Sequence, residues 1–273
     1  METWKEIMTN GPLATFSETG CGETLEDMKL RSINALSRPA NGYDCPLCRN
    51  KGVVFSYEGP EKRLLARDCK CVPMRRAIRK MRESGLGDTL DRFTFQNFQA
   101  DEPWQQALLR CAQSYAEAPK GWLVLLGQPG CGKTHLCTAV CGELLRRGEE
   151  LLYFSWRLES ARIKSALPEA REELLRQYLN APYLYIDDLF KTGRGPDGTV
   201  APSAADLNLA FTLLSARYAR QAPTILSSEL SADALLRLDE AIGSRIVEMA
   251  GKNLCAVRND KKRNYRLKGI REL

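Results

Sequence analysis

Eight residues, 127–134, with the sequence Gly-Gln-Pro-Gly-Cys-Gly-Lys-Thr, decide the fold because they match the pattern G-x-x-x-x-G-K-[ST] in full. An apolar run, residues 122–126, comes directly before them, and a helical stretch, residues 133–147, begins at their last two positions. In such a strand, turn and helix, the glycines let consecutive backbone N–H groups turn inward, and the helix N-terminus adds positive potential. The sequence therefore predicts a phosphate-binding loop.

Each residue of this loop is expected to take part in binding ATP. The predicted contacts are Gly127, Gln128, Pro129, Gly130, Cys131, Gly132, Lys133 and Thr134. We expect Lys133 to act in catalysis by reaching the β- and γ-phosphates, and the Thr134 hydroxyl to bind Mg²⁺. No chemistry of its own is assigned to the Cys131 thiol. His135 is the only histidine of the chain, and its place inside the helix favours packing over catalysis.

A second apolar run, residues 183–186, ends in two acids, Asp187 and Asp188. An acid at the carboxyl end of a buried strand is how a P-loop enzyme brings a carboxylate beside Mg²⁺. We expect Asp187 to bind the metal and Asp188 to polarise the attacking water as a general base. The alternative for Asp188 is a helix N-cap or a solvated neighbour of the site.

Strand-like and helical stretches alternate around the loop. Strands are expected at residues 122–126, 151–156, 183–186 and 224–227, with a weaker fifth at 254–257. Helices are expected at residues 103–118, 133–147, 158–179, 204–220 and 232–249. Continuous apolar strands that alternate with helices indicate a parallel sheet covered on both faces. The predicted fold class is therefore α/β.

The first part of the chain follows a different pattern, and we expect a small α+β module over residues 1–90 before an ATPase domain over residues 91–273. Two helical pieces are expected within residues 1–40, the second at 23–36, followed by a hairpin that contains a strand at 53–57. A basic helix is expected at 73–84, with Pro73 in its first turn. Glycines at 85 and 87 then mark the domain boundary.

Four of the ten cysteines, Cys45, Cys48, Cys69 and Cys71, are clustered around the hairpin. A C-x-x-C pair followed by a second close pair fits a tetrahedral Zn²⁺ site. Because the single histidine is committed to the phosphate-loop helix, the ligands are expected to be four cysteines, in a closed structural site. The alternative is four buried thiols without a metal.

The net charge of +6 conceals two basic segments. Residues 62–82 hold nine basic side chains against one acid, residues 252–273 hold eight against two, and the rest of the chain is acidic. Local basic patches of this kind indicate a polyanionic partner, although solvated helix faces give the same pattern. The basic helix after Cys71 suits nucleic acid or an acidic protein equally well.

The composition, 44% hydrophobic and 27% charged over 273 residues, is ordinary for a globular protein. No apolar run approaches the ~18 residues that a membrane span needs. The start, METWKEIMTN, is charged and has no apolar core, so a secretory signal is not expected. We expect a cytoplasmic protein with no membrane partner.

A series of motifs gives the chain a family resemblance. CPLC and CKC are followed in order by DRFTFQNF, GQPGCGKTHL, YLYIDDLF, PTILSSEL and IGSRI. This series resembles the bacterial and phage helicase loaders of the DnaC/DnaI type, which are AAA+ ATPases related to the IstB-like transposition ATPases. The resemblance implies a five-stranded parallel sheet. The 28 residues after Arg245 include the fifth strand, which leaves too little chain for a separate helical lid domain.

The resemblance also implies roles for single residues. Lys133 and Thr134 become the Walker A contacts, and Asp187 and Asp188 the Walker B pair. Arg245 matches the arginine finger that reaches the γ-phosphate of a neighbouring subunit, which implies self-association. Three further positions match the family less clearly: Glu229 stands where the family usually has the sensor-1 asparagine, so that Ser228 is an alternative, and Arg217 and Arg266 match arginines without a defined role.

The resemblance implies a helicase loader that uses ATP, Mg²⁺ and Zn²⁺, with a hexameric replicative helicase and single-stranded DNA as partners. The DNA contact is expected near Lys191 and Arg194, for which a solvated loop is the alternative. Two other functions remain open: a transposition helper ATPase of the IstB type, and a zinc-dependent DNA-binding regulator switched by nucleotide. The cysteine module favours the loader over the transposition helper.

Overall fold

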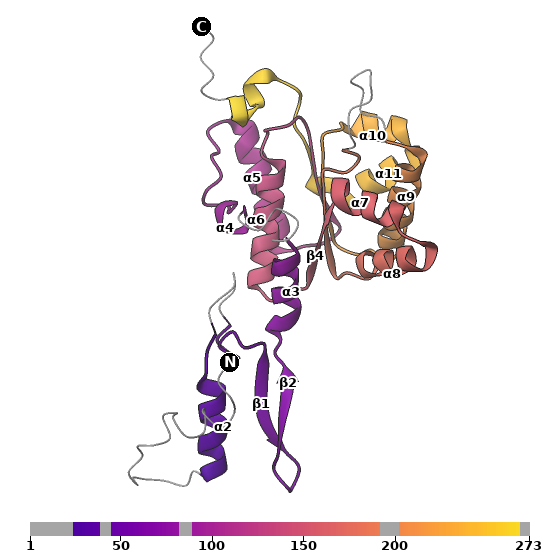
Figure 1. Ribbon diagram of the computed structural model, residues 1–273. Helices are drawn as coiled ribbons and strands as arrows, with labels where there is room; N and C mark the ends of the chain where they lie inside the picture. Colours follow the sequence, from indigo (N-terminus) through magenta and orange to yellow (C-terminus); the bar gives the residue numbers. More distant parts are fainter. Residues whose placement is uncertain (1–23, 39–44, 82–88, 192–201, 268–273) are drawn as a thin grey trace. The chain divides into compact units, whose positions relative to one another are not determined.

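Figure 1 shows the computed structural model of the protein, which describes residues 24–38, 45–81, 89–191 and 202–267. These residues form two compact units. The smaller unit comprises residues 24–38 and 46–69, and the larger unit comprises the rest. The glycines predicted as a boundary, at 85 and 87, lie outside the described residues, as do the first predicted helical piece and Arg194.

The smaller unit is a helix and a hairpin, as the sequence predicts. Helix α2 (Leu25–Ala35) begins with a capping box, in which the Thr24 hydroxyl accepts a hydrogen bond from the Asp27 amide. Strands β1 (Val53–Glu58) and β2 (Arg63–Asp68) pair antiparallel. The Asn34 side chain donates to the Phe55 carbonyl and accepts from its amide, at 3.0 and 3.1 Å. This pair of bonds fixes α2 against β1.

The larger unit is built on a five-stranded sheet in which every pairing is parallel, so the predicted α/β fold is confirmed. Its order is β4-β5-β6-β3-β7. The strands are β3 (Trp122–Leu126), β4 (Leu151–Ser155), β5 (Tyr183–Asp187), β6 (Thr224–Ser228) and β7 (Leu254–Ala256). Because the strands are parallel, the residues that follow β3, β5 and β6 meet at one edge of the sheet.

Helices cover both faces of this sheet. They are α3 (Cys71–Met81), α4 (Thr89–Arg92), α5 (Pro103–Glu117), α6 (Lys133–Arg146), α7 (Trp156–Ser165), α8 (Pro168–Leu179), α9 (Ala204–Ala219), α10 (Ala232–Leu238) and α11 (Glu240–Ala250). Figure 1 shows α5 and α6 on one side of the sheet, with α9 and α11 on the other. Two short strands of the interior, β3 and β6, therefore lie between helical layers.

Two of the helix predictions are wrong, because each predicted stretch forms two separate helices in the structure. The stretch 158–179 is divided by Pro168, which has no amide hydrogen to continue a helix and instead begins α8. The stretch 232–249 is divided at Asp239, whose extended backbone ends α10 and whose carboxylate caps α11 by accepting from the Ile242 amide. The basic helix α3 also begins two residues earlier than predicted, at Cys71.

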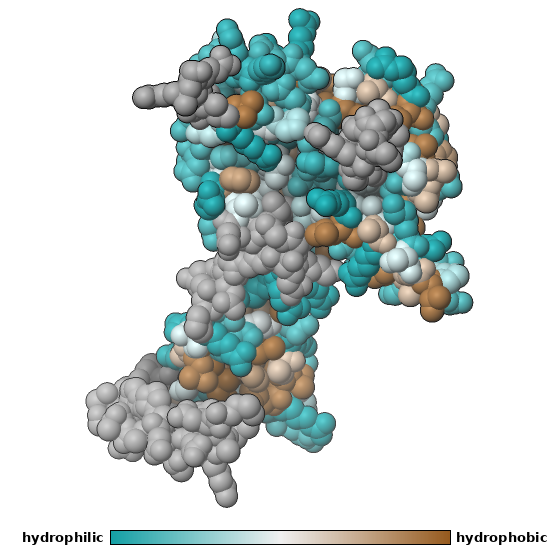
Figure 2. Space-filling view, turned by 45° about the horizontal axis from the view of Figure 1, so that its top comes forward, coloured by the Kyte–Doolittle hydropathy of each residue, from teal (hydrophilic) through white to brown (hydrophobic). Residues whose placement is uncertain are grey.

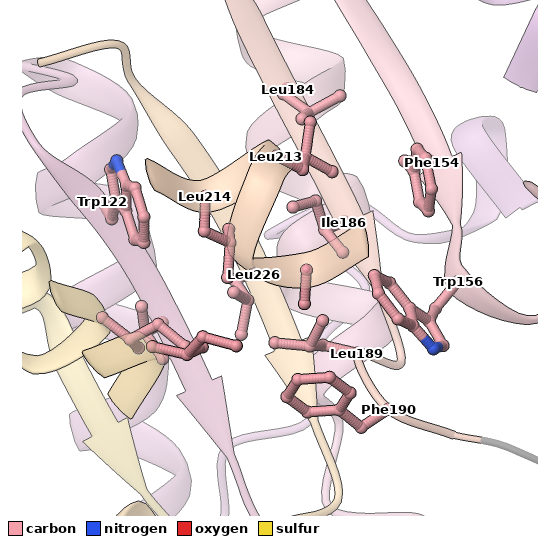
Figure 3. Close-up of a cluster of buried hydrophobic side chains, with 14 of the residues drawn as sticks. Trp122, Phe154, Trp156, Leu184, Ile186, Leu189, Phe190, Leu213, Leu214 and Leu226 are labelled. Carbon is pink, nitrogen blue, oxygen red and sulfur yellow. The ribbon is translucent and has the colours of Figure 1, made fainter. Parts of the chain in front are cut away.

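The core of the larger unit lies between the sheet and the layer of α9 and α11. Figure 3 shows Leu184 and Ile186 of β5 beside Leu213 and Leu214 of α9. Leu189 and Phe190 come from the turn after β5, but they are 1% and 2% exposed and belong to the same core. Since burial of such side chains stabilises by about 1.5–3 kcal/mol each, the core anchors the turn after β5.

One charged side chain, Arg217 of α9, is completely buried beside this core. Its guanidinium donates four hydrogen bonds of 2.6–3.0 Å. The acceptors are the carbonyls of Tyr178, Ala181 and Pro223 and the Thr224 hydroxyl. Burial lowers the pKa of Arg217 to about 10. Arg217 therefore joins α8, α9 and β6 and has a structural role.

On the face drawn in Figure 2, hydrophilic side chains predominate and hydrophobic ones form small separate patches. Helix α3 is amphipathic: Met74 and Ile78 are buried, while Arg76 and Arg79 are exposed. Among the described residues, no helix has the length and apolar character needed to cross a membrane.

Candidate functional site

A cavity of about 450 Å³ opens where the carboxyl ends of the strands meet α6. The phosphate loop lines it with the run from Pro129 to His135. Other walls come from the end of α4, the segment that follows it and the first turn of α5, from the ends of β5 and β6, and from the last described residues. These contribute Arg92, Phe93, Asn97, Phe98, Gln99, Trp104, Gln105, Asp188, Lys191, Glu229, Tyr265 and Arg266.

The glycines of the loop are required by contacts with neighbouring segments. Gly130 and Gly132 have φ of +77° and +93°, in the region that favours glycine. A Cβ on Gly130 would lie 1.8 Å from the Asn264 side chain, and one on Gly132 would lie 2.7 Å from the Phe98 ring. The Tyr265 amide also donates to the Gly130 carbonyl at 2.9 Å. The chain segments that pack around the loop therefore fix its backbone conformation and leave no space for side chains at Gly130 and Gly132.

Lys133 lies inside the curve of this loop and is 6% exposed. Its ammonium donates to the carbonyls of Gly127 and Gln128, at 2.6 and 3.0 Å. A buried ammonium at the N-terminus of α6 provides the positive charge that a phosphate group requires. The neighbouring Cys131 is also buried, which raises the pKa of its thiol and keeps it protonated at neutral pH.

Asp187, at the end of β5, is 8% exposed and is surrounded by hydroxyl groups. They belong to Thr134 (3.3 Å), Tyr153 (3.1 Å), Tyr185 (2.7 Å) and Ser227 (2.6 Å). Burial and the charge of Asp188 raise the pKa of Asp187, while hydrogen bonds from the neighbouring hydroxyls oppose that rise. The carboxylate and the Thr134 hydroxyl offer the oxygen ligands that Mg²⁺ prefers, so the donor set fits this ion.

Asp188 begins a tight turn and carries an ion pair. Lys191 donates to the Asp188 carboxylate at 2.8 Å and to the Glu229 carboxylate at 2.7 Å. Burial by itself lowers the pKa of Lys191, but its hydrogen bonds and charge interactions with the two carboxylates outweigh burial and raise it. Lys191 thus lines the cavity, and the DNA contact expected near this residue stays a prediction. A helix N-cap role for Asp188 is wrong, because no helix begins there.

The remaining positions matched to the family divide into two groups. Arg266 and Glu229 line the cavity, whereas Arg245 and Arg217 are not among its lining residues. The Ser228 hydroxyl is buried and donates to the Leu189 carbonyl, so it supports the turn and does not face the cavity. This geometry disfavours Ser228 as a substitute for a sensor asparagine.

His135 packs against the aromatic segment that precedes α5. Its ring stacks on Phe93, with centroids 4.6 Å apart, and meets Phe98 edge-on at 5.2 Å. Its Nε2 lies 2.9 Å from the Thr94 carbonyl, and burial lowers the pKa of the imidazole. The geometry agrees with the packing role predicted for this residue.

The four clustered cysteines lie together in a separate site. The sulfurs of Cys45, Cys48, Cys69 and Cys71 are all buried and within 4.8 Å of one another. Four sulfurs bound to one tetrahedral zinc ion lie about 3.8 Å apart. The Gly52 amide donates to Cys48 Sγ at 3.3 Å, an orienting bond to a prospective ligand. The donor set therefore fits zinc, with no open position for water.

The sequence agrees with a known family over most of its length. A family model described as IstB-like ATP binding protein matches residues 46–268. The chain belongs to this family. The match includes both the phosphate loop and three of the four clustered cysteines, and the family is described by ATP binding.

Relatives of this IstB-like protein include phage and replication proteins. It is 33% identical over 248 residues to the phage-like element PBSX protein XkdC of Bacillus subtilis, covering 85% of this chain and 89% of the relative. It is 30% identical over 135 residues to the replicative helicase loader DnaC of Escherichia coli K12, covering 46% of this chain and 52% of the relative. The resemblance to DnaC-type proteins is thus confirmed.

A solved structure of a DnaC helicase loader has the same fold. Its TM-score with this protein is 0.54, at 23% identity, over 62% of this chain and 99% of the solved one. At this identity the likeness supports the AAA+ type of fold for the larger unit and nothing finer.

Sequence reasoning missed the groups that hold Asp187 and Asp188. Tyr185 had a signal, because residues two apart on a strand point to the same side, as Tyr185 and Asp187 do. Tyr153 and Ser227 had none, since their nearness to Asp187 depends on the order of strands β4, β5 and β6.

Proposed function

We propose that this IstB-like protein is an ATPase that loads a hexameric replicative helicase onto single-stranded DNA. The main support is the cavity lined by a phosphate loop and Lys133, together with Asp187, which accepts a hydrogen bond from the cavity residue Thr134. The sequence similarity to a replicative helicase loader adds the choice of partner. The proposal thus includes three points: the protein hydrolyses ATP, it binds the helicase, and it acts on single-stranded DNA.

In this proposal the cavity residues divide the work of hydrolysis. Lys133 and the loop amides bind the phosphates, while Thr134 and Asp187 hold Mg²⁺, which supplies neutralising charge to the phosphate oxygens. The oxygen of a water molecule attacks the γ-phosphorus, and Asp188 accepts a proton from that water. The bond from that phosphorus to the β–γ bridging oxygen breaks, and ADP and phosphate leave.

Arg245 is proposed to act on the ATP of a neighbouring subunit. It is partly exposed on α11, and its guanidinium lies over the rings of Phe211 and Tyr218, at 5.3 and 5.6 Å. Arg245→Ala is expected to lower ATP turnover about a hundredfold or more at protein concentrations where subunits associate, because it removes a cation from the transition state. Steady-state turnover over a concentration series measures this.

The control for this experiment is Arg237→Ala, which removes an exposed arginine of α10 and should leave turnover within about twofold. If Arg245→Ala and Arg237→Ala behave alike while both proteins self-associate, Arg245 is not an arginine finger.

The loader proposal and the zinc site are tested together by native mass spectrometry with the replicative helicase from the same source. The full-length protein is expected to carry one zinc ion and to form a defined complex with the helicase. Cys48→Ser is expected to lose the zinc and the complex, because a hydroxyl replaces one of four thiolate ligands. Cys111→Ser, which changes a thiol outside the cluster, should retain both.

Each result in this experiment has a separate meaning. Absence of any complex, with or without ATP, contradicts the loader and favours the transposition helper or the DNA-bound regulator. A complex that survives in zinc-free Cys48→Ser places the docking surface elsewhere. A protein without metal and with four freely reacting thiols contradicts the zinc site alone.

A further inference from the structure

Besides Lys133, the cavity is lined by Lys191 and by the exposed Arg92 and Arg266, and Lys191 alone of these forms an ionic cluster with Asp188 and Glu229 among the described residues. The Lys191 ammonium bridges the two carboxylates, which come from the ends of different strands. All three side chains are partly exposed, at 28%, 39% and 31%, and all three line the cavity with the phosphate loop. A charged group at this place therefore lies beside the predicted phosphate-binding loop.

The backbone holds this cluster in place. Asp188 and Phe190 have φ of +55° and +64°, which non-glycine residues seldom adopt. The two middle residues of the turn, Leu189 and Phe190, are buried in the core, while the flanking Asp188 and Lys191 line the cavity. The Asp188 amide is also fixed in position, because it donates a hydrogen bond to the Ser227 hydroxyl at 2.9 Å. Such strain is retained where the surrounding structure requires a particular side-chain position.

The charge balance of the cluster is unfavourable for a polyphosphate. Two carboxylates share one ammonium, so the cluster is negative overall although it lines a phosphate-binding cavity. Within the described residues, the ammonium has two carboxylate partners for three N–H donors. A phosphate that approaches the cluster is repelled by the carboxylates but attracted by the ammonium.

The position of the cluster indicates which phosphate of a bound nucleotide it would contact. Thr134 and Asp187 would hold Mg²⁺, which would neutralise charge at the terminal phosphates, and Asp188 follows Asp187 directly. The cluster therefore lies on the side of the terminal phosphate. A nucleoside diphosphate has no group that reaches this side.

We propose that Lys191 recognises the terminal phosphate of a bound nucleoside triphosphate and thereby distinguishes triphosphate from diphosphate. This inference rests on the nucleotide binding in the proposed function. The ammonium exchanges its bond with Asp188 for one with the phosphate, and Glu229 keeps it within reach. The same movement frees the Asp188 carboxylate to accept the proton of the attacking water. Binding of a triphosphate therefore makes the general base available.

The experiment measures the dissociation constants of fluorescent ATPγS and ADP, each with Mg²⁺, by anisotropy. Lys191→Met is expected to weaken ATPγS binding about tenfold, the effect of one charge-assisted hydrogen bond, and to change ADP binding less than about twofold. Lys191→Arg keeps the positive charge and should recover much of the preference for ATPγS. Glu229→Gln keeps an oxygen that accepts from Lys191 but removes a negative charge that repels phosphate, and it should increase that preference.

The matched control is Lys164→Met on α7. Lys164 is 32% exposed and pairs with Asp206, but it does not line the cavity, so its loss should leave both constants unchanged. Equal weakening of ATPγS and ADP by Lys191→Met, or no change in either, overturns the inference. Failure of the unmodified protein to bind ATPγS overturns the proposed ATPase instead.

Discussion

Asp187→Asn is expected to lower the rate of ATP hydrolysis at least about a hundredfold while the fold is retained. Asparagine has the same shape and keeps an oxygen that accepts from the Tyr185 and Ser227 hydroxyls. It lacks the negative charge that we propose holds Mg²⁺ beside Thr134, and electrostatic groups of this kind typically contribute a factor of about 10²–10³ to turnover. Turnover at saturating ATP and Mg²⁺, with circular dichroism of both proteins, measures the effect.

Tyr153→Phe is the comparison that separates charge from packing. It removes one hydroxyl that donates to Asp187 and leaves the carboxylate in place. Turnover is expected to fall less than about tenfold, the effect of one hydrogen bond to a charged group. If Asp187→Asn retains most of the turnover, or loses no more than Tyr153→Phe does, Asp187 is not the magnesium ligand.

Arg217→Ala is expected to lower the free energy of unfolding by about 3–5 kcal/mol. The substitution leaves the carbonyls of Tyr178, Ala181 and Pro223 buried without their donor, and it opens a cavity where a fully buried side chain stood. Urea denaturation with linear extrapolation gives the difference. Because many domains have only 5–15 kcal/mol in total, a loss of this size lowers the yield of folded protein as well.

Arg220→Ala serves as the control, since Arg220 lies one turn later near the end of the same helix and is exposed. It also donates to the backbone carbonyl of Leu179, at 3.2 Å. Because the site is exposed, water can bind that carbonyl when the arginine is removed. Its loss should cost less than about 1 kcal/mol. A similar small loss for Arg217→Ala contradicts the structural role, and Arg217 then requires another explanation.

The parts of the structure that were predictable from the sequence are those with local causes. The strand before Gly127, the phosphate loop and the acid at the end of β5 follow from apolar runs and a motif of fixed spacing. The hairpin and the nearby cysteine pairs likewise depend on neighbouring residues. In each case the physical requirement is met within a few positions of the chain.

The parts that were not predictable depend on which strands lie side by side. Glu229 follows β6 and Asp188 follows β5, and only the pairing of these strands brings the two carboxylates to one ammonium. Arg217 matched a family arginine by sequence, yet its burial against three carbonyls follows from the packing of α8, α9 and β6. The break at Pro168 has a local cause in the sequence, although the helical pattern continues on both sides of it.

The order of the strands has a consequence for synthesis on the ribosome. β3, which carries the phosphate loop, is the first strand of the sheet to be made, but its two neighbours, β6 and β7, are the last. Tyr265, which bonds to Gly130, comes later still. At about 5–20 residues per second, Tyr265 is added on the order of ten seconds after Gly130. During translation the nascent loop lacks β6, β7 and Tyr265 for that time, so the complete loop environment forms only after Tyr265 has been made.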